Sequence, residues 1–416
     1  MSATPPTPPA QDQASTATPS RRPRPLSILL ILIPLAAMVI AVALFAVAAR
    51  GGPRIAQVTP KSSAPDAPVG AAPAQAVGIL PSVAPSTPWL SLDPATTLTR
   101  IGIGSCLHQA HPQPIWASVL TAAPQLMLMV GDNVYGDSKG EDLRPLAAAY
   151  RKQLTVPEFA AARARLPMLG IWDDHDYGLN DAGDGYRHKA GAATLFRAFW
   201  QLPDAAPADR GVYYARAFGP PGRRVQIIAL DTRSFRSPLK VKDQSFPHWG
   251  KYMPDPDPAK SMLGAHQWSW LAARLAEPAE LRIVISSIQV LAEGHGFERW
   301  GNLPAERDRL ASLVRSTGAK GVVLASGDRH MGALYAQALG PGRMLPELTA
   351  SSLNRSYGPS KDARTPELKS APYHAENFGL IDIDWAARTL TLRLKGLGGE
   401  AVADLPLTFA ALGHGN

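Results

Sequence analysis

The sequence predicts an α/β protein built as a two-sheet mixed β sandwich flanked by helices. From Leu98 onward, apolar runs of strand length alternate with helix-like segments, which favours largely parallel strands joined by helical crossovers. Later apolar runs follow one another without helices between them, and this favours antiparallel strands. Polar side chains gather directly after several runs, where folds of this class place their binding sites.

The predicted strands of the alternating part are Arg100–Gly104, Leu126–Val130, Pro167–Trp172, Val225–Leu230, Arg282–Ser287 and Gly321–Ala325. The helices predicted among them are Pro114–Ala122, Asp142–Leu154, Lys189–Gln201, Gly264–Leu275 and Pro304–Ser316. The later strands, which we expect to be antiparallel, are Gly332–Ala338, Met344–Ala350, Phe378–Asp384 and Leu390–Leu394. Two sheets packed face to face with helices outside them accommodate both halves.

An uncharged apolar segment precedes the globular part. Residues 26–49 contain no charged side chain, and a helix of that length spans about 36 Å, enough for a bilayer core of about 30 Å. Arg21, Arg22 and Arg24 before this segment indicate a cytoplasmic N-terminus. We therefore predict a single-pass transmembrane signal anchor in a bacterial inner membrane. The domain that follows would lie on the periplasmic, extracytoplasmic side.

Two other export signals are compatible with this region. Ala46–Val47–Ala48 would serve as the cleavage site of a signal peptide, although the apolar run is longer than the usual core of such peptides. Ser20–Arg21–Arg22 is similar to the start of a twin-arginine signal, but the prolines beside Arg24 continue that signal poorly. Each alternative also exports the following domain.

Composition divides the chain into four parts. We predict a disordered cytoplasmic tail at 1–25, the anchor at 26–49, a Pro/Ala-rich linker at 50–97 and one globular domain at 98–416. The net charge is +8, but most of the excess comes from basic residues between 21 and 61. A membrane topology signal explains this charge, so we predict no nucleic-acid-binding module. The composition does not predict an oligomeric state.

The most informative stretch is Trp172–Asp173–Asp174–His175–Asp176, which directly follows a predicted strand. Two carboxylates held about 4 Å apart repel each other by about 4 kcal/mol at an effective dielectric constant near 20. A strand end that concentrates so much negative charge requires either a cation or acids that point apart. Asp176 finds no partner in any other motif, so we assign it no role.

Three further strand ends carry metal-ligand side chains. Cys106 follows the first strand, Asp132 and Tyr135 follow the second, and Asp328 with His330 follow the strand that ends at Ala325. Taken singly, each has a structural alternative: a small buried thiol, an Asx-turn or helix-cap carboxylate, a core tyrosine and an ordinary turn. Together with the acids after Trp172, they predict a metal site.

Five separate sequence blocks resemble the alkaline phosphatase D-like (PhoD-like) family of the calcineurin-like metallophosphoesterase superfamily. In chain order, these blocks are Gly-Ser-Cys at 104–106, Gly-Asp-Asn-Val-Tyr at 131–135, Trp-Asp-Asp-His-Asp at 172–176, Leu-Asp-Thr-Arg at 230–233 and Gly-Asp-Arg-His at 327–330. The resemblance extends from about Arg100 to Trp385. It implies a metallophosphoesterase catalytic domain at 98–416 with a polynuclear metal centre.

The resemblance also implies a ligand set. Cys106, Asp132 and Tyr135 match the family's ligands of Fe(III), and Asp132 would bridge to Ca(II) in the adjoining position. Thiolate and phenolate suit Fe(III) and carboxylate oxygens suit Ca(II), although other divalent metals are compatible. The remaining metal candidates implied by the resemblance are Asp173 or Asp174, Asn180, Asp328 and His330.

Three residues are candidates for catalysis. His175 matches the general acid of the superfamily, and Arg329 and Arg233 are candidate contacts to a phosphoryl oxygen. For Arg233, an internal salt bridge is an equal alternative. The sequence departs from the superfamily at Gln289, where a metal-binding histidine is expected, and at Trp300–Gly301–Asn302, which lacks an aspartate. The coordination of the second metal and the presence of a third therefore stay open.

The function implied by the resemblance is metal-dependent hydrolysis of phosphate monoesters, diesters or both by a bridging hydroxide. The substrate would be a small molecule or a polymer, and the membrane would be contacted through the N-terminal helix. One alternative is a phospholipase or phosphodiesterase acting on lipid or teichoic-type diesters. Another is a membrane-tethered phosphate-binding module without turnover. Gly102–Ile103–Gly104 lacks the third glycine of a dinucleotide motif, and no zinc CxxC pattern or GxSxG elbow is present.

Overall fold

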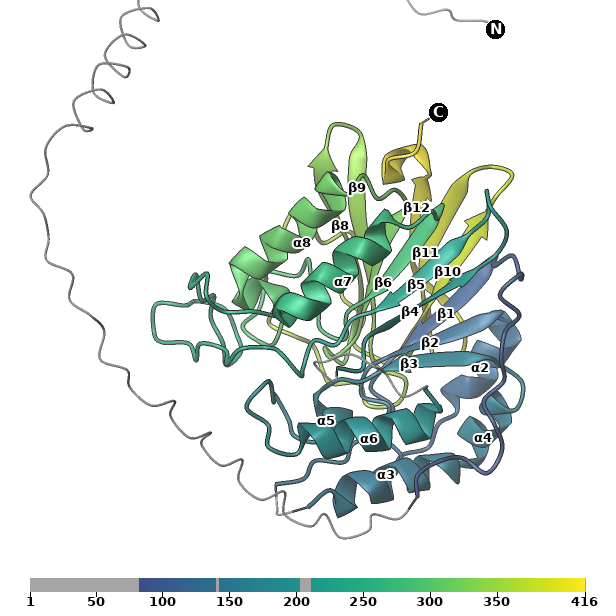
Figure 1. Cartoon of the computed structure of the whole chain (residues 1–416), viewed down its shortest axis with the longest axis vertical. Helices are drawn as coiled ribbons and strands as arrows, with labels where there is room; N and C mark the ends of the chain where they lie inside the picture. The colour runs from purple at the N-terminus through teal and green to yellow at the C-terminus, as the bar shows by residue number, and fades with distance from the viewer. Residues whose placement is uncertain (1–81, 140–141, 203–210, 416) are drawn as a thin grey trace, which may run out of the picture. The chain divides into compact units, whose positions relative to one another are not determined.

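The computed structural model describes residues 82–139, 142–202 and 211–415 (Figure 1). The predicted cytoplasmic tail, the predicted anchor at 26–49 and most of the predicted linker lie outside these ranges. Within the described ranges, every helix is too short or too polar to cross a bilayer.

The first of two six-stranded sheets has the order β12-β11-β10-β1-β2-β3. Its three N-terminal strands run parallel, and its three C-terminal strands are antiparallel to their neighbours. The strands are β1 (Arg100–Gly104), β2 (Leu126–Val130), β3 (Met168–Ile171), β10 (Asn377–Asp384), β11 (Thr389–Gly396) and β12 (Ala401–Thr408).

The second six-stranded sheet has the order β4-β5-β6-β7-β9-β8. Its four central strands run parallel, and an antiparallel strand lies at each edge. The strands are β4 (Tyr214–Phe218), β5 (Val225–Ala229), β6 (Leu281–Ile285), β7 (Val322–Ser326), β8 (Gly332–Gly340) and β9 (Arg343–Ala350).

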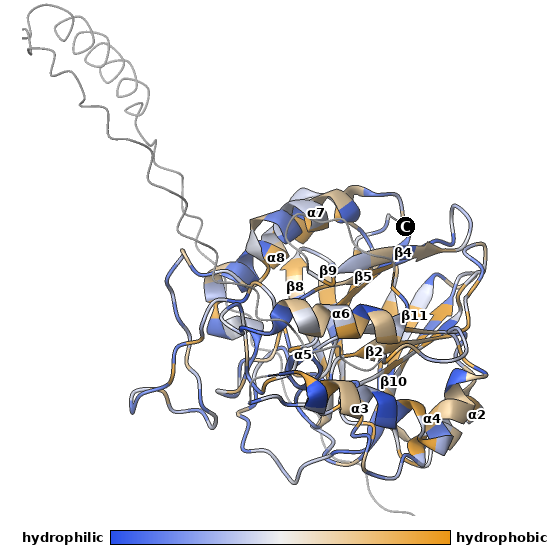
Figure 2. Ribbon diagram, turned by 60° about the horizontal axis from the view of Figure 1, so that its bottom comes forward, coloured by the Kyte–Doolittle hydropathy of each residue, from blue (hydrophilic) through white to orange (hydrophobic). Residues whose placement is uncertain are grey.

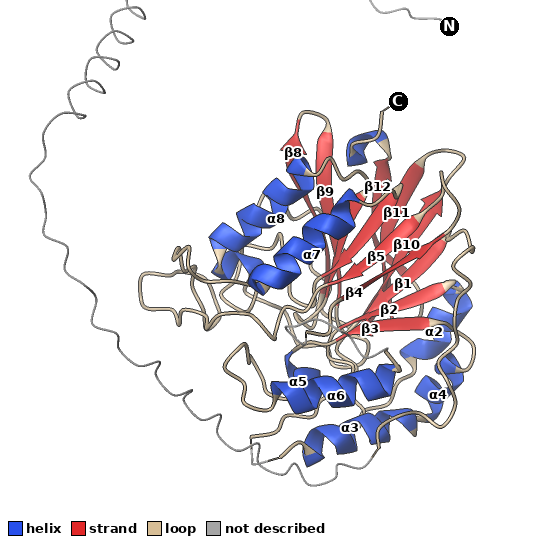
Figure 3. Cartoon of the chain, viewed as in Figure 1, coloured by secondary structure: helices blue, strands red, loops and turns tan. Residues whose placement is uncertain are grey.

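Helices cover the outer faces of the two sheets (Figure 3). On the first sheet these are α2 (Ile115–Ala122), α3 (Arg144–Leu154), α4 (Pro157–Arg163), α5 (Asp174–Tyr177) and α6 (Lys189–Trp200). On the second sheet they are α7 (Gly264–Ala276) and α8 (Pro304–Ser316). Short 3-10 turns lie at Trp300–Asn302 and Ala410–Leu412.

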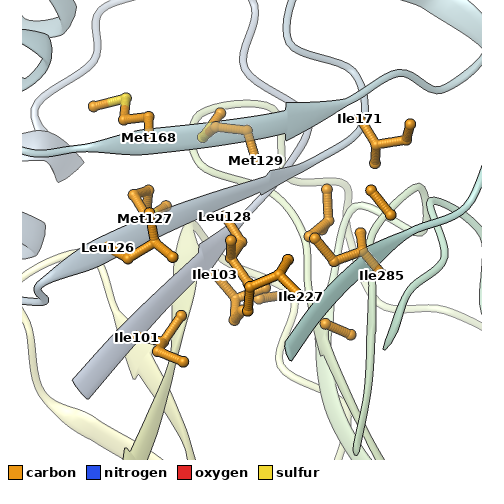
Figure 4. Close-up of a cluster of buried hydrophobic side chains, with 14 of the residues drawn as sticks. Ile101, Ile103, Leu126, Met127, Leu128, Met129, Met168, Ile171, Ile227 and Ile285 are labelled. Atoms are coloured by element: carbon orange, nitrogen blue, oxygen red, sulfur yellow. The ribbon is translucent and has the colours of Figure 1, made fainter. Parts of the chain in front are cut away.

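Side-chain alternation along the central strands builds two hydrophobic layers. Successive residues of a strand point to opposite faces of the sheet. Accordingly, Ile227 and Ile285 pack into the core shared with Ile103 of the first sheet (Figure 4). Ile228 and Val284, one residue away from them, pack with the residues of α7 and α8. Hydrophobic positions therefore dominate the strands, whereas the covering helices mix hydrophobic and hydrophilic positions (Figure 2).

The predicted two-sheet α/β sandwich is confirmed, and the six predicted strands of the alternating part all form. Two strands, β4 and β12, and two helices, α4 and α5, were not predicted. β4 is an edge strand whose central residues are exposed, and β12 is exposed along most of its length, so neither is a continuous apolar run. The antiparallel expectation holds for β8, β10 and β11, but β9 runs antiparallel to β8 and parallel to β7.

Candidate metal centre

The loops that follow β1, β2, β3 and β7 meet at one edge of the sandwich. A close approach between two of them depends on Gly131, which has φ +114°. A Cβ atom at this position would lie 2.6 Å from Cβ of Asp173. Glycine is the residue that permits both the left-handed backbone and this separation. The loop after β2 can therefore bring Asp132 against the acids that follow β3.

Unusual backbone conformations concentrate in these loops. Cys106, Asp132, Asp328 and His330 have φ angles of 56°, 48°, 64° and 54°. Left-handed backbone is uncommon for residues other than glycine and is found preferentially at functional sites, where surrounding contacts hold it. In each case this conformation turns the chain sharply at the end of a strand. The side chain then points across the sheet edge toward the other loops.

A first group of ligand atoms surrounds Asp132. Its Oδ2 lies 3.5 Å from Sγ of Cys106 and accepts a hydrogen bond of 3.1 Å from the hydroxyl of Tyr135. Nε2 of His330 lies 3.5 Å from the same hydroxyl. The ligand atoms of Cys106, Asp132 and His330 all lie within 4.8 Å of one another. Ser351, which sequence reasoning missed, supports this group through a 3.0 Å contact between its hydroxyl and the thiol.

A second set of ligand atoms lies next to the first and shares Asp132 with it. Asp132, Asp174 and His175 form one group of atoms within 4.8 Å, and Asp173, Asp174 and Asp328 form another. Oδ2 of Asp173 and Oδ1 of Asp174 are buried, and neither has a hydrogen-bond partner among the described residues. An unpaired buried carboxylate oxygen is costly unless a cation compensates its charge.

The electrostatics of the cluster also favour cations. Burial, reinforced by the charge of Asp174, raises the pKa of the Asp132 carboxyl well above its usual value. Burial and neighbouring carboxylates raise the pKa of Asp328 in the same way, and burial with Asp132 raises that of the Cys106 thiol. These shifts mean that the side chains present do not balance the negative charge. Thiolate, phenolate and imidazole beside a cluster of carboxylates fit a transition metal next to a cation that prefers oxygen ligands.

His175 is oriented by an acid that sequence reasoning did not single out. Its Nδ1 lies 2.6 Å from Oδ2 of Asp137, so Nε2 is the ring nitrogen left for other contacts. Burial lowers the pKa of His175, but Asp174, Asp132 and Asp137 outweigh this effect and raise it to about 11. Asp137 lies two residues beyond Tyr135, at the end of the polar segment after β2, and this position is the signal that could have identified it. The other oxygen of Asp137 accepts the backbone N–H of Asn180.

Arg233 lies behind the centre and forms the internal salt bridge that the sequence left open. Its side chain is fully buried, 2.5 Å from Asp173 and 2.5 Å from Glu298. Glu298 also pairs with Arg236 at 2.8 Å. The guanidinium of Arg233 therefore positions Asp173, and Arg233 is not among the described residues that line the adjoining cavity. Sequence reasoning missed Glu298 because no acid-rich motif surrounds it.

Arg329, by contrast, lies in the cavity wall. It pairs with Asp362 at 2.8 Å and its guanidinium lies 4.5 Å from the centroid of the Phe297 ring. The cavity has a volume of about 250 Å³. The predicted residues that line it are Asp132, Asp174, His175, Asn180, Asp328, Arg329 and His330. Cys106, Tyr135 and Asp173 lie behind this lining and contact it from the protein side.

Asp176 and Gln289 have structural roles, because both are hydrogen-bonded to neighbouring residues. The expectation that Asp176 has no partner is wrong, because it accepts hydrogen bonds from the backbone of Asn133 at 3.0 Å and of Asp173 at 2.5 Å. It therefore fastens the loop after β3 to the loop after β2. Gln289 takes part in a buried neutral network, donating to Thr349 at 2.9 Å and contacting His295 at 3.0 Å.

Replacing Arg233 by methionine should destabilise the fold by about 3–5 kcal/mol, because Asp173 would then be buried without a cationic partner and Glu298 would keep only Arg236. The free energy of unfolding, measured by denaturant titration, tests this expectation. Arg144→Met is the matched control, since Arg144 pairs with Asp142 at 2.7 Å but is 79% exposed. Equal effects of the two substitutions would contradict the positioning role of Arg233.

A family model and a curated relative both indicate the same family for this chain, and a solved structure agrees with it in fold. The sequence pattern of the PhoD-like phosphatase family matches residues 102–394. Alkaline phosphatase D of Bacillus subtilis (strain 168) is 25% identical over 214 residues, which cover 46% of this chain and 35% of that protein. The chain thus matches about a third of the length of this relative. The solved structure of PhoD superposes with a TM-score of 0.60 at 16% identity, covering 77% of this chain and 70% of that one, and shows the same fold. The chain belongs to the PhoD-like phosphatase family.

Proposed function

We propose that this protein hydrolyses phosphate esters at a metal centre that lines the cavity described above. The observation that supports this most is that several groups of metal-ligand atoms share Asp132 and Asp174. Among the described residues, two buried carboxylate oxygens of these groups also lack a hydrogen-bond partner. Membership of the PhoD-like phosphatase family and the cationic Arg329 in the same cavity wall add support.

The residues divide into two ligand sets. In this proposal Cys106, Asp132, Tyr135 and His330 would hold Fe(III). Asp132 with Asp173, Asp174 and Asp328 would hold Ca(II) or another divalent ion. Metal ions at such a centre lower the pKa of water and neutralise charge on the phosphoryl oxygens. Asn180 lines the cavity next to Asp174 and is the remaining candidate for the second set.

His175 and Arg329 act on the substrate in this scheme. Asp137 holds Nδ1 of His175, so Nε2 would donate its proton to the oxygen of the departing alcohol. Cations bound beside Asp132 and Asp174 would offset the carboxylates that raise the pKa of His175, which makes the proton easier to transfer. The guanidinium of Arg329 is fixed by Asp362 and would bind a phosphoryl oxygen through its N–H groups.

Hydrolysis and metal binding should be lost together when Asp132 is replaced by asparagine. Because Asp132 belongs to both ligand sets, Asp132→Asn should lower the metal content of the purified protein and reduce turnover by more than about 100-fold. Elemental analysis and hydrolysis of 4-nitrophenyl phosphate measure the two effects. Asp308→Asn is the control, since Asp308 is 70% exposed on α8.

Undiminished turnover of Asp132→Asn would refute the proposed centre. A wild-type protein that is full of metal yet hydrolyses no ester would favour a phosphate-binding module. The ratio of rates on 4-nitrophenyl phosphate and bis-4-nitrophenyl phosphate separates a monoesterase from a phosphodiesterase or phospholipase that acts on lipid or teichoic-type diesters.

The proton-donor role of His175 predicts a dependence on the leaving group. His175→Ala should slow hydrolysis of alkyl phosphates by about 10²–10⁴-fold, because their alkoxides leave poorly without a proton. Hydrolysis of 4-nitrophenyl phosphate should suffer less, since nitrophenolate leaves without one. The surface substitution His266→Ala on α7 should change neither rate. Equal losses on both ester types would argue against proton donation by His175.

We also propose that residues 26–49 anchor the enzyme in the membrane, with the catalytic domain on the periplasmic side. The uncharged apolar composition of this segment and the arginines before it support the proposal. Immunoblotting of cell fractions should find the full-length chain in the membrane fraction. A shortened, soluble product would overturn the anchor in favour of a cleaved export signal.

A further inference from the structure

Two exposed aromatic side chains lie at the cavity of the candidate metal centre. Trp249 is 44% exposed and Tyr357 is 53% exposed, and both line this cavity. Large hydrophobic side chains are exposed at only three other described positions, Leu90, Val241 and Leu397, none of which lines it. Exposed aromatic surface gathered at a binding site usually marks a ligand contact.

The backbone holds Trp249 in place although its side chain is exposed. The segment around it is joined to Gly296 by backbone hydrogen bonds: the N–H groups of Lys251 and Tyr252 donate to the Gly296 carbonyl, and the Gly296 N–H donates to the Trp249 carbonyl at 2.6 Å. Gly250 has φ +133°, and a Cβ there would lie 2.2 Å from the Gly296 backbone. Trp249 is thus positioned before a ligand arrives, which reduces the entropy lost on binding.

Tyr357 is positioned by a different segment of the chain. It belongs to the loop between β9 and β10, and its ring stacks on the His330 imidazole with a centroid separation of 4.1 Å. One face of the Tyr357 ring is covered by this contact, so its exposure comes from the other face and the edges. Nε of Arg355 donates to its hydroxyl at 3.3 Å. A ring adjoining His330 lies next to the ligand atoms of the first group.

A chain of contacts connects Trp249 to the residue proposed to bind phosphoryl oxygen. The guanidinium of Arg329 lies over the Phe297 ring, and Phe297 contacts Trp249 edge to face with a centroid separation of 4.7 Å. One aromatic ring therefore separates Arg329 from Trp249. A phosphate ester held at Arg329 would have its organic part within reach of the exposed tryptophan.

We propose, building on the proposed function, that Trp249 and Tyr357 select phosphate esters whose alcohol bears a planar aromatic ring, as a nucleoside does. The cavity of about 250 Å³ is smaller than the roughly 300–1,000 Å³ of a typical small-molecule site. It accommodates the phosphoryl group and the adjoining atoms, and the ring of the alcohol lies at the exposed mouth. Stacking on an aromatic face is favourable for planar rings and sequence-tolerant among bases.

The comparison of adenosine 5′-monophosphate with ribose 5-phosphate tests this proposal. The two substrates lose the same kind of primary hydroxyl, so a difference in kcat/KM reports contacts to the base. The wild-type holoenzyme should prefer the nucleotide. Trp249→Leu and Tyr357→Leu should each reduce this preference by about fivefold or more, because leucine keeps apolar volume but removes the stacking face.

Conservative variants and a distant control complete the experiment. Trp249→Phe and Tyr357→Phe keep a ring and should retain most of the preference. Leu397→Ala removes exposed apolar surface elsewhere, on the turn between β11 and β12, and should leave kcat/KM for both substrates unchanged. Metal content should be equal in all variants, which separates a specificity effect from loss of the centre.

Three outcomes would overturn the inference. These are a wild-type enzyme without preference for the nucleotide, leucine variants that keep the preference, and variants that lose activity equally on both substrates. Leucine variants that keep the preference would indicate apolar contact of the kind an acyl chain makes. In each of these cases the wild-type enzyme still hydrolyses phosphate esters. Failure of the proposed function differs, because neither substrate nor 4-nitrophenyl phosphate would then be hydrolysed.

Discussion

Buried negative charge at the ends of parallel strands is the constraint on which the rest of this structure depends. Asp132, Asp173, Asp174 and Asp328 converge there, and the described protein opposes them chiefly with Arg233 and with the imidazole of His175. Such an arrangement is unfavourable unless further positive charge completes it. The closely packed sheets keep the acids from separating, so rearrangement does not relieve the repulsion between them.

Hydrogen bonds from neighbouring polar groups hold the carboxylates of Asp173 and Asp174 in place beside the cavity. Oδ1 of Asp173 is held by Arg233 and by the hydroxyl of Ser287, which donates at 2.5 Å. That leaves Oδ2 without a partner on the protein side. The same division applies to Asp174, whose Oδ2 accepts the backbone N–H of Asp181 at 2.8 Å and whose Oδ1 stays unpaired. Each carboxylate is thus fixed through one oxygen, and its other oxygen is available to bind a cation.

The sequence was informative where the physical signal is local. Central strands are buried on both faces, so they are continuous apolar runs, and the polar residues after them lie at one sheet edge by topology alone. Edge strands β4 and β12 are partly exposed and lack that signal. The partners Glu298 and Ser351 depend on which loops meet in three dimensions, and no local pattern distinguishes them from surface polar residues. The burial of Arg233 also follows from packing between loops after β3, β5 and β6, which a single sequence does not reveal.

The strand order of the first sheet determines when, during folding, the residues of the candidate metal centre come together. β1 pairs with β10, and the ion pair between Arg100 and Asp382 joins residues 282 positions apart. The contact between Cys106 and Ser351 spans 245 positions. Contacts of such long sequence separation form late, because a large loop must close before they stabilise anything. A chain still emerging from a ribosome or a translocation pore therefore presents scattered ligands rather than a site. Any metal would then be captured only in the compartment in which the whole domain completes folding, so the place of folding would decide which ions the protein acquires.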